Sequence, residues 1–477
     1  MATRTPSKTK EPVAPEIPSP LPQSHNSPVA DRLARGKALR ERCPRKAQAD
    51  WRPPTKRADP IDLLIENSRG RLEDLVPIRY GRMLANPFAF YRGAAAIMAY
   101  DLAHTLSTGL NVQACGDCHL VNFGGFATAE RKIIFDINDF DETSIAPWEW
   151  DVKRLAASFV IAGRNNGFSA ADCEAAAQRV AQNYRLKLAE YSQQSVLDVW
   201  YDSLNFDEII HTLPDRQMRK FYLKKLGAAT EQRAHEKEFA KLAFAAGETP
   251  RIIDQPPLIY HLTGVDDAEQ RATWEASLAD YLKSLPPERR VLLDRYKLTD
   301  AAIKVVGVGS VGTFCGVALL MSGKGDPLFL QFKQARPSVL EPYAGASPFK
   351  HAGQRVVVGQ RLMQSASDMF LGWYTGAGRE ARQFYVRQLA DAKIKPVIEI
   401  MKPQNLLSYA AVCGWALARA HARSGDAAVL TGYLGSGSAF EEAIVAFSVA
   451  YADQNERDHA ALVAAVRDGK VEARLVE

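Results

Sequence analysis

Acid and amide side chains gather in one short stretch of the sequence. Asp117 and Asn122 come first, and Asp136, Asp139 and Asp141 follow them. Phosphoryl transfer needs such a set, because one carboxylate orients the acceptor hydroxyl while an amide and a second carboxylate hold Mg²⁺. Magnesium prefers hard oxygen ligands and takes few of them from the protein. A group of acids near a turn is more often a solvated loop, but the short apolar runs on both sides of this one favour a built site.

A glycine-rich segment later in the chain could hold the phosphates. Gly307, Gly309 and Gly312 form a GxGxxG pattern that includes Ser310. Glycines let backbone amides approach phosphate oxygens, and Lys333 in the next apolar run offers a point charge for them. No helix start follows the third glycine, so the pattern does not suit a Rossmann dinucleotide site. Alone the signal is weak, because any glycine-rich β-hairpin can match it.

A CxxCH pattern formed by Cys115, Cys118 and His119 indicates a different chemistry. The pattern is typical of covalent haem attachment, which requires export. The first thirty residues lack the apolar run of a signal peptide, and a single CxxC lacks the second pair that a structural zinc site needs. Haem or redox chemistry is therefore the lesser alternative.

A two-stranded hairpin is expected to position the acids. Short apolar runs lie on both sides of the polar turn 128–132, which predicts two strands that return the chain to its start. Asp117 and Asn122 would then share one mouth with the later acids. β-branched and glycine residues from 302 to 335 predict antiparallel strands around the glycine pattern. Hydrophobic periodicity predicts helices at 94–106, 151–164, 170–192, 355–365, 406–422 and 439–466, and strands at 369–374 and 383–389.

The composition allows one large core. The chain has 477 residues, of which 47% are hydrophobic, and its net charge of +5 is modest for that length. No basic face with interleaved aromatic residues is visible, so nucleic acid is not an expected partner. Six cysteines in so long a chain do not make a disulfide framework, and no apolar window approaches the ~20 residues of a membrane span. We therefore expect a cytoplasmic location without a membrane partner.

The segment GDCHLVN at 116–122 resembles the GDxHxxN catalytic loop of aminoglycoside phosphotransferases and choline kinases. The following NDFD at 138–141 resembles their metal-binding segment, and PWEWDVKRLA at 147–156 is similar to the segment of their later buried aspartate. The resemblance implies that Asp117 is the catalytic base. It also implies structural roles for His119 and Asp151, the second as a brace for the loop.

The same resemblance implies that Asn122 and one aspartate hold Mg²⁺. Spacing from Asn122 favours Asp136, whereas the DF context favours Asp139. Both alternatives stay open at the level of sequence.

A longer resemblance covers roughly residues 61–463. The stretch 79–155, together with GQR, SASDMFLGW, YVRQLAD and YADQ further on, resembles the bacterial family called domain of unknown function 2252. That family is grouped with kinase-like folds, so the resemblance implies a fold more than an activity.

The order of the motifs implies a circular permutation. The catalytic loop precedes the glycine loop, which is the reverse of ordinary kinases, and ALARAHARSGD at 416–426 resembles the helix that leads into the catalytic loop of phosphotransferases. The helix 355–365 contains no Glu, so Glu341 is the expected partner of Lys333, although an exposed Glu at a helix start is an equal alternative.

The expected fold is therefore α+β and two-lobed, of the protein-kinase-like type with circularly permuted lobe order. The expected segments are a disordered basic Pro/Ser-rich tail at 1–50, a large-lobe core with the catalytic loop and the metal-binding hairpin at 51–195, a helical insert at 196–299, a small β lobe with the glycine loop and the strand lysine at 300–390, and C-terminal helices that complete the large lobe at 391–477.

The resemblance implies a phosphotransferase that uses ATP and Mg²⁺. The phosphates would lie under the glycine pattern, the adenine edge would meet backbone groups from Gln388 to Ala390, and the acceptor would be an unidentified small molecule or protein. Lys153, Arg154 and Arg361 are candidates to bind an anionic acceptor. The alternatives are a non-catalytic nucleotide-binding pseudokinase and a nucleotidyl (AMP) transferase that uses the same site.

Overall fold

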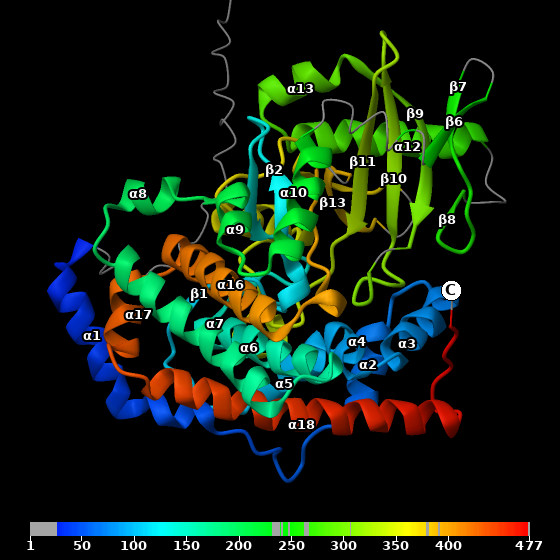
Figure 1. The fold of residues 1–477 in the computed structure, drawn as a ribbon. Coiled ribbons are helices and arrows are strands. Elements are labelled where there is room, and N and C mark those ends of the chain that lie inside the picture. Colours follow the sequence, from blue (N-terminus) through cyan, green and yellow to red (C-terminus); the bar gives the residue numbers. More distant parts are fainter. Residues whose placement is uncertain are drawn as a thin grey trace, which may run out of the picture.

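The computed structural model describes residues 26–475, apart from 231–238, 240–241, 247–248, 262–266, 306, 378–380 and 390–391. These residues form a mixed α+β structure in which a sheet region lies beside a larger helical region (Figure 1). None of the helices formed by the described residues combines the length and the apolar character that crossing a membrane requires.

A six-stranded antiparallel sheet carries the glycine loop. Its strands are β8 (Ile259–Tyr260), β9 (Tyr296–Lys304), β10 (Cys315–Ser322), β11 (Pro327–Gln334), β12 (Gly372–Thr375) and β13 (Gln383–Gln388). They lie in the order β12-β13-β11-β10-β9-β8, and each neighbouring pair is antiparallel. The glycine pattern joins β9 to β10, and Lys333 lies opposite Cys315 on the neighbouring strand. The predicted strands around the glycine pattern are thus confirmed.

Helices connect this sheet to the rest of the molecule. The helices α12 (Asp267–Lys283) and α13 (Pro287–Leu293) pack apolar side chains such as Tyr281 and Leu293 against the sheet. The helix α15 (Ala352–Met363) contacts both β13 and α16 (Pro403–Ser424), so it lies between the sheet and the helical region. The short helix α14 (Glu341–Ala344) precedes it.

The helical region is built around α6 (Trp148–Asn165), which packs against α7 (Ala170–Tyr191), α16 and α18 (Ala439–Arg467). Every residue of α6 from Trp148 to Gly163 is buried, so the helix is enclosed on all sides. Its charged side chains therefore need partners within the protein. The smaller helices of this region are α2 (Pro60–Ser68), α3 (Val76–Leu84), α4 (Pro87–Gly93), α5 (Ala95–Ala103) and α17 (Ala427–Leu434), with 3₁₀ turns at Glu73–Leu75, Leu120–Asn122 and Ile398–Ile400.

Two strand pairs bring the acid-bearing segments together, as the sequence predicts. The strands β2 (Phe123–Ala127) and β3 (Ile133–Ile137) form an antiparallel hairpin that β5 (Leu204–Asn205) extends, while β1 (Asn111–Ala114) pairs with β4 (Ser144–Pro147). The first register places Phe123 opposite Ile137, and the second places Ala114 opposite Ser144. The loops 115–122 and 138–143 therefore face each other.

The N-terminal part of the chain differs from the expected tail at 1–50. The helix α1 (Val29–Arg42) and the 3₁₀ turn Arg45–Ala49 are ordered, and α1 packs on α17. Arg40 donates hydrogen bonds to the carbonyl oxygens of Gly432 and Tyr433, which lie in the last turn of α17. The basic residues that suggest a solvated tail thus satisfy the carbonyl groups at a helix end. Residues 1–25 lie outside the described part of the chain.

The expected helical insert at 196–299 is helical only in part. Its helices are α8 (Val196–Tyr201), α9 (Phe206–Thr212), α10 (Arg216–Thr230), α12 and α13, but its middle forms the hairpin β6 (Ala243–Ala246) and β7 (Thr249–Ile252) together with β8, and its end begins β9. Ile252 and Ile259 pack with the apolar residues of β10, which explains the change. Short strands that complete a sheet elsewhere give little local periodicity.

Candidate functional site

Two cavities differ sharply in their lining. The larger, of about 650 Å³, lies against the six-stranded sheet and α12 and has an almost wholly apolar lining. The second, of about 450 Å³, lies where the glycine loop meets the acid-bearing loops. Its lining includes Asp117, Asn122, Asp139 and Asp141 together with the segment 307–310. We place the candidate site in the second cavity, because chemistry needs polar groups that converge.

The loop that carries Asp117 is braced from beneath by Asp151. The two carboxylate oxygens of Asp151 accept hydrogen bonds from the backbone N–H groups of Cys115 (2.6 Å) and Gly116 (3.0 Å). His421 lies on the other side, with Nε2 3.2 Å from Asp151 Oδ2. Gly116 has a φ of +84°, and a Cβ there would lie 2.2 Å from the carbonyl oxygen of Glu142. A glycine is therefore required at this turn.

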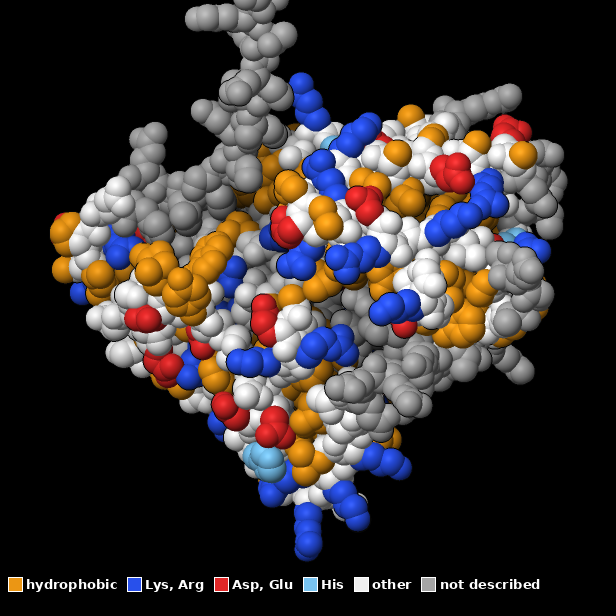
Figure 2. Space-filling model, turned by 90° about the horizontal axis from the view of Figure 1, so that it is seen from above, with side chains coloured by type: hydrophobic (Ala, Val, Ile, Leu, Met, Phe, Trp, Pro, Cys, Tyr) orange, Lys and Arg blue, Asp and Glu red, His pale blue; other side chains and the backbone are white. Residues whose placement is uncertain are grey.

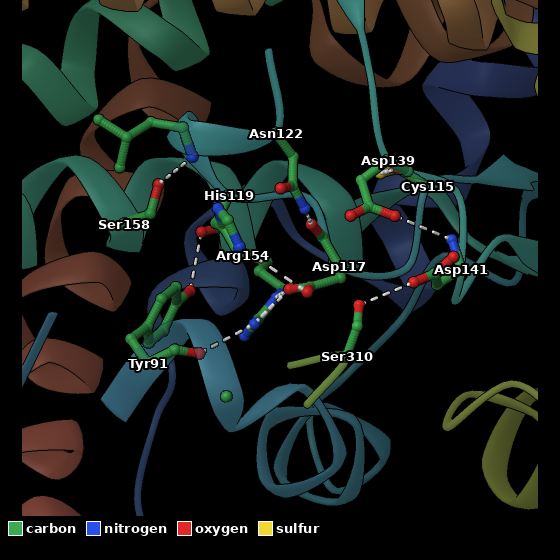
Figure 3. Close-up of polar contacts among 12 residues, drawn as sticks. Tyr91, Cys115, Asp117, His119, Asn122, Asp139, Asp141, Arg154, Ser158 and Ser310 are labelled. Atoms are coloured by element: carbon green, nitrogen blue, oxygen red, sulfur yellow. Dashed lines mark hydrogen bonds and ion pairs between the residues drawn. The ribbon is translucent and has the colours of Figure 1, made fainter. Parts of the chain in front are cut away.

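Asp117 forms an ion pair with Arg154 of α6. Its Oδ1 accepts hydrogen bonds from Nε (2.8 Å) and Nη2 (2.5 Å) of Arg154, as Figure 3 shows. Arg154 also donates to the carbonyl oxygen of Tyr91 and lies over the Tyr91 ring. Both hydrogen bonds from Arg154 hold Oδ1 of Asp117, and neither of them involves Oδ2. Arg154 was considered at the sequence level as a contact for an acceptor, whereas here it positions the carboxylate.

His119 lies beside the same carboxylate. Its Nε2 is 3.8 Å from Asp117 Oδ2, and its side chain is 4% exposed. Burial lowers the pKa of His119 to about 3, so the imidazole is neutral at pH 7. A neutral ring of this kind limits the space around Asp117 without adding charge.

Asn122 and Asp139 lie on the two facing loops. Asn122 Nδ2 donates to the backbone carbonyl of Asp117 (2.7 Å), which fixes the orientation of the amide and leaves its oxygen as a possible ligand (Figure 3). Burial and the neighbouring Asp141 carboxylate raise the pKa of Asp139. A divalent cation would relieve the repulsion between the Asp139 and Asp141 carboxylates, so Asn122 and Asp139 suit such an ion as ligands.

Asp136 does not line this cavity. Its carboxylate is fully buried and accepts two hydrogen bonds of 2.6 Å from Arg419 Nη2, with the Ser365 N–H at 3.0 Å. Of the two aspartates left open by the sequence, Asp139 lies at the cavity and Asp136 joins β3 to α16.

Asp141 joins the glycine loop to the strand lysine. Its Oδ2 lies 2.5 Å from Lys333 Nζ and accepts a hydrogen bond from Ser310 Oγ (3.1 Å), while Tyr385 donates to its other oxygen. Burial opposes ionisation, but the Lys333 ammonium lowers the pKa of Asp141 to about 2. Residues 141 and 333 are far apart in the sequence, yet they meet at the wall of the site.

The expected ion pair between Lys333 and Glu341 is wrong. Glu341 instead accepts a hydrogen bond from the Ser338 N–H (2.9 Å) and lies 3.7 Å from Arg355 Nε. Glu341 begins a four-residue helix and acts at the start of that turn, whereas Asp141 reaches the lysine from the facing loop.

The glycine loop is tied down through its carbonyl oxygens. Arg71 donates to the carbonyl oxygens of Gly309 (2.8 Å) and Val311 (2.7 Å), and Arg82 donates to that of Gly307. Gly307 and Gly312 have φ values of +70° and +84°, which other residues rarely adopt. The loop is thus held against α2–α3 with its bends at the two outer glycines.

A family comparison adds one decisive finding. The family model described as "Uncharacterized protein conserved in bacteria (DUF2252)" matches residues 71–465. The chain belongs to this family. The matched span includes both loops of the site, the glycine loop, the helix α16 and nearly all of α18. No curated protein and no solved structure matches the chain, so the DUF2252 assignment brings no activity with it.

The DUF2252 chain does not place Gln388 in the cavity of Asp117. The Gln388 N–H donates to Asp368, and the residue lines smaller cavities behind the sheet. Ala390, the end of the segment expected to meet adenine, lies outside the described residues. The cysteines of the CxxCH pattern are both fully buried, and burial raises the pKa of Cys118. They belong to the loop 115–122 and pack into the hydrophobic core as neutral thiols.

Sequence reasoning missed the arginines that line the cavity, whereas the acceptor candidates Lys153 and Arg361 do not line it; the missed residues are Arg71, Arg79, Arg92 and Arg336. Arg387 donates to the Asn138 carbonyl oxygen and lies near Asp139, which raises the pKa of Arg387 against the effect of burial. Lys153 is buried under Phe447, and burial lowers its pKa to about 8. Arg361 donates to the Leu371 carbonyl oxygen. No periodic pattern marks these residues, because their partners come from distant elements.

Within the described residues, no group of three or more His, Cys, Asp or Glu side chains is arranged to hold a metal ion. The candidate protein ligands for an ion at this site are therefore the oxygens of Asn122 and Asp139, and Mg²⁺ takes few ligands from the protein. On the face above the sheet region, basic and acidic side chains are interspersed in the parts of the chain that are described (Figure 2).

Proposed function

We propose that this protein is an ATP- and Mg²⁺-dependent phosphotransferase with a circularly permuted, kinase-like fold. The observation that carries the proposal is the single cavity lined by Asp117, Asn122, Asp139 and the glycine loop, with Lys333 bound to its wall through Asp141. Elements from both halves of the chain thus supply the groups that phosphoryl transfer requires.

The order of the strands supports the permutation. A glycine loop joins two antiparallel strands, the next strand carries the lysine, and a helix and two more strands follow. The loops with the acids come earlier in the chain but pack against this unit, and α16 lies near them through His421 and Asp151. This is the arrangement expected if the ends of a kinase-like chain were joined and a new start opened before the catalytic loop.

In the proposed reaction the acceptor hydroxyl oxygen bonds to the γ-phosphorus of ATP while the bond from that phosphorus to the bridging oxygen breaks, which releases ADP. Asp117 accepts the hydroxyl proton, and Arg154 orients its carboxylate. Asn122 and Asp139 would hold Mg²⁺, which neutralises charge on the phosphates. Backbone groups of the glycine loop and Lys333 position the phosphates.

A thermal-shift screen of nucleotides with and without Mg²⁺ tests this proposal. MgATP should raise the melting temperature of the wild type and of Asp117→Asn, and it should have little effect on Asp139→Asn. The exposed Asp326 offers a matched control, because Asp326→Asn should respond as the wild type does.

Product analysis separates the alternatives. Release of ADP that depends on Asp117 supports phosphoryl transfer, release of pyrophosphate indicates nucleotidyl transfer, and binding without turnover in both wild type and Asp117→Asn indicates a pseudokinase. The absence of a shift with every nucleotide would contradict the proposal as a whole.

A further inference from the structure

Four arginines line the cavity that contains Asp117. Arg71 precedes the 3₁₀ turn Glu73–Leu75, Arg79 lies on α3, Arg92 lies on α4, and Arg336 follows β11. They come from separate elements and converge on one space. Such a concentration of positive charge in a cavity needs a physical explanation.

None of the four forms an ion pair with a carboxylate of the described residues. Other buried arginines of the protein are compensated, since Arg57 pairs with Asp101 and Asp458 and Arg419 pairs with Asp136. Glu142 acts on the charges of Arg71, Arg79 and Arg336 without forming an ion pair, and it accepts a hydrogen bond from the Val339 N–H (2.8 Å). The four guanidinium groups therefore share the cavity with acidic side chains, but no direct ion pair with a carboxylate of the described residues neutralises them.

Three of these arginines use their donors to hold the backbone. Arg71 ties down the glycine loop, Arg79 bonds to Ser68 and to the Gly93 carbonyl oxygen, and Arg336 bonds to the carbonyl oxygens of residues 67 and 69. Their charges still act on the cavity, because neutral carbonyl groups satisfy hydrogen bonds without cancelling a charge. Burial and repulsion from Arg79 lower the pKa of Arg71.

Arg92 is different, because its donors are unused. No hydrogen bond from its guanidinium to the described residues is formed, and its Nε is buried without a partner. The residue lines the cavity, and the carboxylate that acts most strongly on its charge belongs to Asp117. Arg92 is half-buried, and a guanidinium whose buried Nε lacks a partner is a group that a bound anion would satisfy.

The position of Arg92 relates it to the reaction centre. It follows Tyr91, whose carbonyl oxygen binds the same Arg154 that holds Asp117. A Cβ on Gly309 would lie 3.3 Å from the carbonyl oxygen of Arg92, so α4 also touches the tip of the glycine loop. Arg92 therefore stands between the proposed base and the loop for the nucleotide phosphates.

We propose that Arg92, together with Arg71 and Arg336 of the same cavity lining, forms an anion-binding subsite for the acceptor, which is a small hydroxy compound that carries a phosphate group. The identity of this ligand as an acceptor rests on the proposed phosphotransferase function. A phosphate dianion matches several converging cations and the forked donors of arginine better than a neutral sugar does. A cationic amine would be repelled, and a cavity of about 450 Å³ holds a small molecule rather than a protein segment.

Calorimetric titration of glycerol 3-phosphate, glycerol and choline tests the subsite. The wild type should bind glycerol 3-phosphate and neither glycerol nor choline. Arg92→Met should weaken this binding at least tenfold, while Arg92→Lys, which keeps the charge but not the fork, should weaken it less. Arg69→Met is the matched control, because Arg69 is 74% exposed and pairs only with Glu66 among the described acids, and it should bind as the wild type does.

Two further titrations make the outcomes decisive. MgATP should bind to Arg92→Met as it binds to the wild type, which shows that the variant is folded and that the subsite is not that of the nucleotide. If glycerol 3-phosphate binds equally to wild type and Arg92→Met, or if Lys333→Met abolishes its binding and Arg92→Met does not, the subsite is wrong. If binding depends on Arg92 but MgATP never binds, the anion subsite stands and the phosphotransferase function falls.

Discussion

Replacing Asp136 with asparagine should destabilise the fold without changing the response to Mg²⁺. Asp136 and Arg419 are both fully buried, and the substitution leaves the guanidinium without its only carboxylate among the described residues. Breaking a buried pair in this way costs about 3–5 kcal/mol, because the remaining charge is neither solvated nor neutralised. The Met363 carbonyl oxygen at 3.2 Å from Arg419 Nη2 offers only partial compensation.

The variant Asp139→Asn should behave in the opposite way. In the wild type, burial and the neighbouring Asp141 carboxylate raise the pKa of Asp139. Removal of the Asp139 charge should therefore change the free energy of unfolding by less than about 1 kcal/mol. The response of the melting temperature to MgATP should be lost in this variant.

Urea denaturation gives the free energy of unfolding, and thermal shift with MgATP gives the metal response of the same two variants. The reasoning is refuted if Asp136→Asn is as stable as the wild type, or if it loses the Mg²⁺ response while Asp139→Asn keeps it.

Three further predictions concern other parts of the structure. Gly36→Ala should destabilise the protein by several kcal/mol, because the new Cβ would lie 2.0 Å from the Val429 carbonyl oxygen. The control Gly227→Ala, whose Cβ would have no atom within 4 Å, should be neutral or stabilising by about 1 kcal/mol. Equal effects of the two substitutions in urea denaturation would contradict the packing of α1 on α17. The Lys333 ammonium lowers the pKa of Asp141 from 3.8 to about 2, so this ion pair stabilises the fold above pH 4 and its contribution is lost as the pH falls toward 2. The difference in free energy of unfolding between wild type and Lys333→Met should therefore shrink by roughly 2 kcal/mol between pH 5 and pH 2. A difference that stays constant with pH would refute the pairing. Arg154→Met should lower turnover at least tenfold with unchanged MgATP binding, while Arg164→Met, at the exposed end of the same helix, should keep full turnover in a steady-state assay; unchanged turnover in Arg154→Met would show that Asp117 needs no positioning.

Local patterns in the sequence are sufficient to predict the strands that hold the loops of the site. The hairpin with its turn at 128–132 and the strands around the glycine pattern follow from short apolar runs and turn residues. Because hairpins are local, the presence of Asn122 and Asp139 at one cavity could be predicted from them.

Contacts between distant segments could not be predicted in the same way. Every residue of β3 is buried, so alternation along the strand does not show which acid faces the cavity, and the partner of Asp136 lies on α16. The prediction of Glu341 as the partner of Lys333 is wrong, because Asp141 reaches the lysine from another loop. The arginines of the cavity come from separate elements that share no sequence pattern.

A basic composition also misled the interpretation of the N-terminal segment. Arg40 and Arg45 look like residues of a solvated tail, yet they donate to carbonyl oxygens at the end of α17. Composition measures polarity, but it does not show whether a distant helix end supplies acceptors.

A crystal structure of the protein with Mg²⁺ and a non-hydrolysable ATP analogue tests the central claim most directly. The account predicts phosphates between the loop 307–310 and Lys333, with the metal ion held by Asn122 and Asp139. A nucleotide bound in the apolar cavity against α12, or phosphates distant from Asp117, would contradict it.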